Sequence, residues 1–211
     1  MNLTRGRFIS LEGGEGVGKS TQLKALAAAL ERHGLGVVVT REPGGSAGAE
    51  AIRTLLLEGE PGFWGPRAEA LLFAAARSDH VDKVIKPALE RGEWVLCDRF
   101  HDSSRAYQGG GSGLSDADIL TLHRIGSEGF VPDLTIVLTL DEAEARARAK
   151  SRDGGAGDRF EQRDDGFHAK VAAAFRSFAA AEPDRIKLVD ASGAPQAVTE
   201  RLLALLAPLL P

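Results

Sequence analysis

Short apolar runs alternate along this chain with longer segments whose apolar positions have helical spacing. The short runs occupy residues 8–11, 37–39, 94–97, 134–138 and 186–189. Runs of this kind, bounded by turns or helices, are typical of buried strands. The longer segments occupy residues 22–32, 78–91, 115–126, 141–150 and 161–181. Because strands that alternate with helices indicate βαβ crossovers, the pattern predicts an α/β fold of three layers, with a five-stranded parallel sheet flanked by helices.

The ends of these segments refine the picture. Ser115 and Asp141 stand where a capping side chain is expected, with Asp118 and Glu144 in the first turns that follow. The interval 40–94 is too long for one crossover helix and predicts two or three helices, in an insertion of the kind that usually serves a ligand. The apolar segment 198–210 predicts a last helix that covers the sheet. No repeat, linker or change of composition divides residues 1–211, so we expect a single domain.

Composition excludes several classes of protein. The chain has 211 residues, 43% of them hydrophobic and 27% charged, which is ordinary for a globular protein. A net charge of −4 argues against a sequence-independent grip on nucleic acid. The single Cys97 has no partner for an internal disulfide. The start of the chain lacks the pattern of a secretion signal. The apolar stretch 202–211 is far shorter than the roughly 20 residues that span a bilayer. We therefore expect a cytoplasmic protein without nucleic-acid or membrane partners.

The segment after the first strand carries the clearest chemical signal. It reads Gly13, Gly14, Glu15, Gly16, Val17, Gly18, Lys19, Ser20, followed by Thr21. This is the phosphate-loop pattern, in which backbone N–H groups wrap a phosphate at a helix N-terminus, the lysine reaches the terminal phosphates and the Ser hydroxyl holds Mg²⁺. The plainer interpretation, a glycine-rich turn without a ligand, rarely has the whole pattern in the correct context between a strand and a helix.

The loop predicts a bound nucleoside triphosphate but leaves its use open. One alternative to an enzyme is a GTP-driven switch. Such switches normally read guanine with an Asn-Lys-x-Asp motif, and the chain has Asn at position 2 alone. A phosphotransferase is therefore the favoured class.

Candidate acceptor-site residues follow the other strands. Asp98 and Arg99 end the third strand, where an acid suits the water shell of Mg²⁺ and an Arg fork suits phosphate oxygens. Phe73 and Arg77 are four residues apart, so on a helix they share a face that suits the ring and edge of a base. The plainer interpretations are a surface Asp–Arg pair and a core Phe beside a surface Arg.

Basic residues surround a glycine-rich stretch near the fourth helical segment. Arg146, Arg148, Lys150, Arg152 and Arg159 flank residues 153–158. This arrangement suits a lid, at about residues 148–160, that closes over phosphates and expels water. A solvated, Arg-rich helix is the alternative.

Taken together, these segments make the chain resemble the bacterial thymidylate kinases over nearly its whole length. The resemblance rests on residues 8–21, 41–45, 73–77, 98–100, 106–111 and 158–161. It implies a P-loop kinase that transfers the γ-phosphoryl group of ATP to dTMP with Mg²⁺, and it implies a homodimer. A kinase for another nucleoside monophosphate or small acceptor is the alternative.

The resemblance also implies roles for single residues. Phe73 would stack on thymine, Arg77 and Gln108 would bond its edge with Ser104 nearby, and Tyr107 would exclude a ribose 2′-hydroxyl. Arg53 and Arg99 would hold the dTMP phosphate, Glu42 and Pro43 would belong to the same site with a cis peptide bond between them, and Glu15 would approach the sugar 3′-hydroxyl or the metal water shell. The catalytic set would be Glu15, Lys19, Arg99 and a lid arginine, Arg152 before Arg148, with Ser20 and, through water, Asp98 at the metal.

Overall fold

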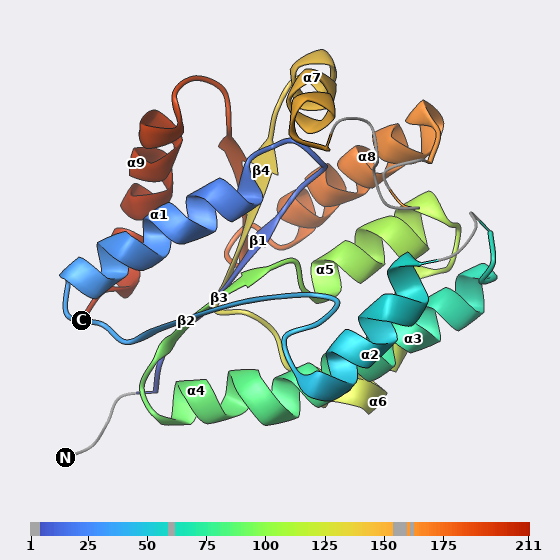
Figure 1. Ribbon diagram of the computed structural model, residues 1–211, viewed down its shortest axis with the longest axis horizontal. Helices are drawn as coiled ribbons and strands as arrows, with labels where there is room; N and C mark the ends of the chain where they lie inside the picture. The colour runs from blue at the N-terminus through green and yellow to red at the C-terminus, as the bar shows by residue number, and fades with distance from the viewer. Residues whose placement is uncertain (1–4, 59–61, 154–159, 161–162) are drawn as a thin grey trace.

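A parallel sheet lies at the centre of the molecule (Figure 1). The computed structural model describes residues 5–58, 62–153, 160 and 163–211, with side chains for all of these but 149–153. Within them the sheet has five strands in the order β2-β3-β1-β4-β5, every pair parallel. The strands are β1 (Phe8–Glu12), β2 (Val37–Arg41), β3 (Trp94–Asp98), β4 (Leu134–Thr139) and β5 (Ile186–Asp190).

Each predicted strand is confirmed, and each continues one or more residues beyond its apolar run. The added residues are polar: Glu12, Arg41, Asp98, Thr139 and Asp190 close the five strands. Parallel strands present these ends along one edge of the sheet, where a ligand crevice forms. The hydrophobic pattern therefore predicted the strands but did not include the polar residues at their carboxyl ends, which lie at the ligand crevice.

Helices cover both faces of the sheet, as the sequence predicted. Their bounds are α1 (Lys19–Arg32), α2 (Ala47–Leu57), α3 (Pro66–His80), α4 (Lys86–Glu90), α5 (His101–Ser104), α6 (Asp116–Ser127), α7 (Glu142–Asp153), α8 (Asp165–Ala181) and α9 (Pro195–Leu206), with π-helical turns η1 (Val81–Ile85) and η2 (Arg105–Gly111) and a final 3₁₀ turn η3 (Ala207–Leu209). Helices α1 and α9 pack on one face through residues such as Leu26 and Leu202. On the other face, η1 and α4 pack against Phe8 and Val95, and α8 packs near Val137 and Ile186.

Two segments differ from the prediction. The helix expected at 78–91 begins earlier, at Pro66, and continues through η1 into α4. Its Ala-rich first half has little apolar periodicity, so the pattern did not predict this earlier start. Residues 101–111, which end in Gly109, Gly110 and Gly111, were not predicted as helical. They form α5 and η2 because η2 packs tightly on α8: a Cβ at Gly110 would lie 2.8 Å from the Ala174 Cβ, and one at Gly111 would lie 2.4 Å from the Phe167 ring.

The predicted caps are confirmed. The Ser115 hydroxyl accepts a hydrogen bond from the Asp118 N–H, and the Asp141 carboxylate accepts from the N–H groups of Ala143 and Glu144. In the part of the chain that the structure describes, every helix is too short or too polar to cross a bilayer.

Two buried histidines predict a pH-dependent stability. The rings of His101 and His123 stack with centroids 4.5 Å apart, and both Nδ1 atoms are buried without a hydrogen-bond partner in the described part of the chain. Burial lowers the pKa of His123 to about 4 and lowers the pKa of His101 well below its usual value. The unfolded chain therefore binds more protons than the folded one from about pH 6.5 downward, so stability falls as the pH falls through this range.

We expect His123 alone to lower the free energy of unfolding by about 2 kcal/mol between pH 7 and pH 4.5. Urea denaturation of the protein and of His123→Phe at both pH values measures it. The variant should be the less stable protein at pH 7, because it loses the hydrogen bond to the Phe130 carbonyl. The gap should shrink by pH 4.5; a gap that stays constant contradicts the prediction.

Candidate active site

The glycine-rich segment forms a tight loop between β1 and α1. Gly13 has φ +127°, and a Cβ there would lie 2.4 Å from the Leu138 carbonyl oxygen, so glycine is required by both conformation and space. Gly18 precedes α1 with φ +94°. The loop therefore turns back over the first turn of α1, with the helix N-terminus beneath it.

Lys19 lies over this loop. Its Nζ donates to the carbonyl oxygen of Gly14 at 2.8 Å and to that of Gly13 at 3.3 Å, and 7% of the residue is exposed. Burial, followed by the nearby Arg99, lowers its pKa. An anionic ligand in the loop would oppose this shift and favour the ammonium form.

Ser20 and Asp98 meet at the same edge of the sheet. The Ser20 hydroxyl donates to Asp98 Oδ2 at 3.1 Å, which joins the start of α1 to the end of β3. A hydroxyl and one carboxylate suit Mg²⁺, which takes oxygen ligands and keeps several waters. Among the described residues, no group of three or more His, Cys, Asp or Glu side chains is placed to hold a metal ion.

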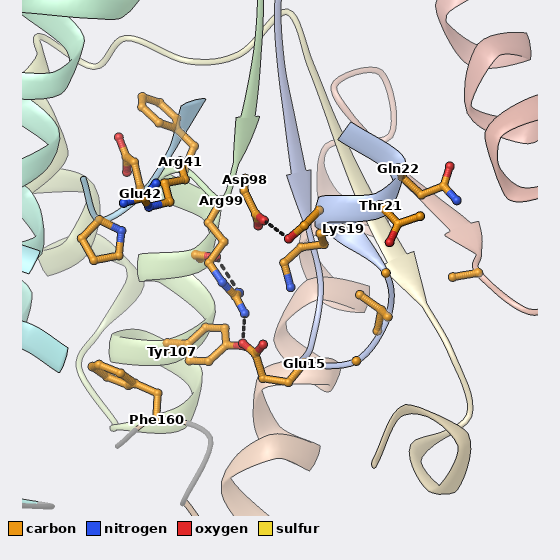
Figure 2. Close-up of a pocket in the computed structure, with 18 of the residues that line it drawn as sticks. Glu15, Lys19, Thr21, Gln22, Arg41, Glu42, Asp98, Arg99, Tyr107 and Phe160 are labelled. Carbon is orange, nitrogen blue, oxygen red and sulfur yellow. Dashed lines mark hydrogen bonds and ion pairs between the residues drawn. The ribbon is translucent and has the colours of Figure 1, made fainter. Parts of the chain in front are cut away.

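Arg99 stands between the loop and the rest of the crevice (Figure 2). It donates to the Gly13 carbonyl at 3.1 Å and to the Ser103 hydroxyl at 3.2 Å, and it forms an ion pair with Glu15. Its guanidinium lies 4.9 Å from the centroid of the Tyr107 ring. Burial raises the pKa of Tyr107 to about 12, so the ring is neutral beside this cation.

The opposite end of the crevice is a rigid polar pocket. Arg77 is 3% exposed, so it is not the surface arginine of the plainer interpretation. It donates to Glu42 at 2.7 Å and to the Ser104 hydroxyl at 2.8 Å, while His80 contacts the other Glu42 oxygen at 3.1 Å. Arg77 and its neighbours draw the pKa of Glu42 below its usual range although burial opposes this, so the pair is ionic.

A cis peptide bond and two side-chain hydrogen bonds complete this pocket. The Glu42–Pro43 peptide bond is cis, as predicted. Arg53 donates to the Pro43 carbonyl at 2.6 Å. Gln108 donates through Nε2 to Glu69 at 2.9 Å, with both side chains buried, and this contact fixes which way its amide points.

These elements enclose one continuous cavity of about 730 Å³. The sequence-predicted residues along its wall are Glu15, Gly16, Val17, Gly18, Lys19, Ser20, Thr21, Glu42, Pro43, Arg53, Phe73, Arg77, Asp98, Arg99, Ser104, Tyr107, Gln108 and Arg148. Gly13 and Gly14 are not among the residues that line the cavity, but their carbonyl oxygens accept hydrogen bonds from Lys19. The side chain of Arg152 and all of Arg159 lie outside the described residues.

Sequence reasoning missed several functional candidates. Gly193, Pro195 and Val198 line the cavity, as does Arg148. The available signal was the Gly and Pro two residues apart in the turn after the last strand. Phe160 packs on Phe73, with ring centroids 5.6 Å apart. Glu12 and Glu69 were also missed, because a lone acid near an apolar segment has no local pattern.

Comparison with known proteins gives concordant matches. The family model described as thymidylate kinase matches residues 11–202. A thymidylate kinase of Rhizorhabdus wittichii is 62% identical, with 98% of this chain and 99% of the relative covered. One of Gluconobacter oxydans is 52% identical over 94% of this chain and 93% of its own. The crystal structure of thymidylate kinase from Ehrlichia chaffeensis superposes with a TM-score of 0.78 at 31% identity, covering 96% and 99% of the two chains.

Proposed function

Because the chain belongs to the thymidylate kinase family, we propose that it transfers the γ-phosphoryl group of ATP to dTMP, giving dTDP and ADP in dTTP synthesis. One observation carries the assignment to this cavity. Lys19 on the phosphate loop and Arg77 in the polar pocket face the same space, and Arg99 stands between them. A donor on the loop and an acceptor in the pocket would meet at Arg99.

In phosphoryl transfer the protein mainly aligns the donor and acceptor phosphates and neutralises the charge on the transferred group. The loop amides and Lys19 would hold the ATP phosphates, and Arg99 and Arg53 would hold the acceptor phosphate for in-line attack. A phosphate acceptor is already ionised, so the reaction requires no general base. Glu15, paired with Arg99, would orient that arginine and approach the sugar 3′-hydroxyl or the metal water shell.

The acceptor base would lie between Phe73 and the Arg77 edge of the pocket. Arg77 is held by Glu42 and Ser104, and Gln108 by Glu69, so their polar atoms are fixed before a base arrives. Preorganised donors and acceptors raise selectivity, because a mismatched base leaves buried groups unpaired. Tyr107 would stand against the sugar and favour a deoxyribose.

The direct test is Mg²⁺-ATP consumption with dTMP, dUMP, UMP, CMP, AMP and GMP offered separately. Strong turnover with dTMP and weak turnover with the others supports the assignment. Turnover with a different monophosphate favours the alternative kinase, and silence with all six overturns the acceptor assignment.

Ser20 and Asp98 are the proposed Mg²⁺ residues, Asp98 through water. Bound Mg²⁺ would neutralise charge between the outer phosphates of ATP. Ser20 would contribute a direct oxygen, and Asp98 would orient a water of the ion.

We expect Asp98→Asn to raise the Mg²⁺ concentration for half-maximal activity by about tenfold, because it removes the carboxylate that orients the water shell. Titration of Mg²⁺ at saturating ATP and dTMP measures it, and EDTA should abolish the wild-type rate. Asp184→Asn, at an exposed position, is the control and should behave as wild type. An unchanged titration curve for Asp98→Asn would remove this residue from the metal site.

Arg152 is the proposed catalytic lid residue, and Arg148 the second choice, in a lid at about 148–160 of a single domain 1–211. Arg148 lines the cavity and donates to the Ala191 carbonyl at 3.4 Å and to Glu144 at 2.5 Å. A phosphate-neutralising arginine acts mainly in the transition state, so Arg152→Ala should lower kcat at least about tenfold with a smaller change in KM. The same loss in Arg148→Ala instead would move the role to Arg148.

A homodimer is the proposed assembly. Exposed apolar side chains on three neighbouring helices support it: Leu55 on α2, Leu71 on α3, and Leu120 and Ile125 on α6, the last 75% exposed. Figure 1 places these helices side by side. Light scattering should give a dimeric mass for the wild type and a monomeric mass for Leu71→Glu/Ile125→Glu; a wild-type monomer contradicts the proposal. A cytoplasmic location also remains a proposal from the sequence.

A further inference from the structure

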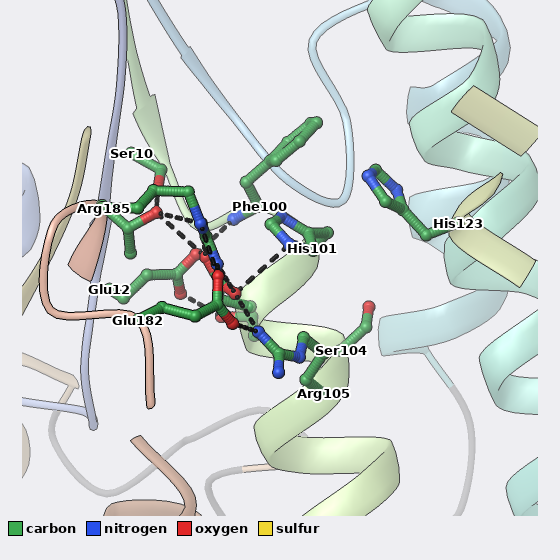
Figure 3. A network of polar contacts seen from close by, with 12 residues as sticks. Ser10, Glu12, Phe100, His101, Ser104, Arg105, His123, Glu182 and Arg185 are labelled. Carbon is green, nitrogen blue, oxygen red and sulfur yellow. Dashed lines mark hydrogen bonds and ion pairs between the residues drawn. The ribbon is translucent and has the colours of Figure 1, made fainter. Parts of the chain in front are cut away.

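Glu12 is a buried acid at the end of β1 that the proposed mechanism does not use. It is fully inaccessible to solvent. Its Oε1 accepts a hydrogen bond from the Phe100 N–H at 2.7 Å, and its Oε2 accepts one from the Ser103 hydroxyl at 2.5 Å (Figure 3). Both carboxylate oxygens are therefore directed at the segment that follows β3.

That segment presents Arg99 to the cavity in an unfavourable backbone conformation. Arg99 has φ +69°, and among the described residues only it and Glu128 are non-glycine residues with positive φ. Such a conformation is unfavourable for a residue with a Cβ and persists where the surroundings hold it. Here the Arg99 N–H donates to the Leu11 carbonyl at 2.9 Å, and Glu12 holds the next N–H, that of Phe100.

Glu12 also reaches the Arg99 side chain through one intermediary. The Ser103 hydroxyl donates its proton to Glu12 and accepts a hydrogen bond from Arg99 Nη1 at 3.2 Å. In its ionised form, Glu12 sets the direction of the hydroxyl, and the hydroxyl sets the position of the guanidinium. Backbone and side chain of Arg99 are fixed by the same acid.

Asp102 and Glu182 lie in a neighbouring cluster of charges and engage its cations, Arg105 and Arg185. Arg185 pairs with Asp102 at 2.7 Å and with Glu182 at 2.7 Å, and Arg105 pairs with the same two acids. Burial, then the charge of Asp102, raises the pKa of Glu12 to about 8, so the group is a carboxylate above about pH 8. The hydrogen bonds from Ser103 and Phe100 and the charge of Arg99 favour that ionised form. An apolar residue would fill this volume more cheaply, so packing alone does not explain a carboxyl group here.

We propose that Glu12 is a positioning residue for the acceptor phosphate, which acts by holding Arg99 through the Phe100 amide and the Ser103 hydroxyl. The inference rests on the proposed function, because it takes Arg99 to be the group that contacts the dTMP phosphate. It predicts that Glu12 matters for ligands that carry this phosphate and not for the same ligand without it.

The test compares dTMP with thymidine, which lacks the phosphate, in the isosteric variant Glu12→Gln. The kinetics are measured at pH 9, where Glu12 is a carboxylate. The Gln oxygen still accepts from Phe100, but its NH₂ leaves the Ser103 proton without an acceptor. We expect kcat/KM for dTMP to fall at least about tenfold, while KM for ATP and the inhibition constant of thymidine stay within about twofold. In an Arg99→Ala background, Glu12→Gln should cause no further loss.

Two further variants keep the test decisive. Glu182→Gln makes the same chemical change in the neighbouring cluster, without contact to Arg99, and should keep wild-type kinetics. If Glu12→Gln does not fold, Ser103→Ala, which cuts only the link to the guanidinium, carries the test with the same direction of change. Equal losses for dTMP and thymidine, or wild-type kinetics in Glu12→Gln, overturn the positioning role. A wild-type protein that does not phosphorylate dTMP would instead refute the proposed function.

Discussion

Replacement of Lys19 by Met is expected to lower kcat about 10³-fold, the largest effect of any single substitution considered for this kinase. The ammonium lies over the phosphate loop, 2.8 Å from the Gly14 carbonyl oxygen, and only 7% of the residue is exposed. A charge in such a site interacts with phosphate oxygens far more strongly than it would in water. Met keeps most of the length of the side chain and removes the charge and its donors.

The loss should fall mainly on kcat. Charge spread over the transferred phosphoryl group grows toward the transition state, and a cation that follows it stabilises that state more than bound ATP. A 10³-fold loss corresponds to about 4 kcal/mol of transition-state stabilisation. Steady-state ADP formation with dTMP, at several ATP concentrations, separates kcat from KM.

Lys24→Met is the matched control for this measurement. Lys24 lies on the same helix α1 but is exposed, so its replacement makes the same chemical change away from the cavity. It should keep kcat within about twofold. A Lys19→Met protein that retains more than a tenth of wild-type kcat would show that the loop amides alone suffice to stabilise the transferred group.

Replacement of Arg99 by Lys is expected to lower kcat/KM for dTMP about 10²-fold while leaving the fold intact. The guanidinium donates to Gly13 and Ser103, pairs with Glu15 and lies on the Tyr107 ring, so several contacts depend on its planar fork. Lys is a point charge on a flexible chain and cannot reproduce them together. The acceptor phosphate would then be held without a fixed direction for in-line attack, and misplacement by about 1 Å costs on the order of 10² in rate.

Kinetics at varied dTMP and at varied ATP distinguish this effect from general damage. The loss should appear in kcat/KM for dTMP, with KM for ATP within about threefold. Arg91→Lys, at an exposed position paired with Glu93, is the control for the chemical change and should have no effect. Equal losses of kcat/KM for ATP and dTMP would contradict an acceptor-specific role.

Local sequence signals predicted the phosphate loop and the order of the elements. The spacing of Gly13, Gly18 and Lys19 fixes where a phosphate can be wrapped, because the glycine conformations and the helix N-terminus are properties of adjacent residues. The pair Phe73 and Arg77 shares a helix face for the same reason. Resemblance supplied the acceptor roles, which spacing alone did not give.

Tertiary contacts decided the parts that local signals missed. Residues 101–111 became helical because Gly110 and Gly111 admit the side chains of α8, a contact between segments far apart in the chain. Glu69 also acts through a contact between distant segments, because it accepts the hydrogen bond that orients the Gln108 amide. Neither contact is encoded by a pattern within one element.

The sequence by itself determined the α/β fold, the parallel sheet and the nucleotide loop, because hydrophobic period and glycine spacing act over a few residues. Only the tertiary structure decided how Glu12 reaches Phe100 and Ser103, and which groups orient Arg77 and Arg99. The physical reason is that buried polar side chains must find partners, and in a parallel sheet these partners come from the segments after strands that are neighbours in space but distant in sequence.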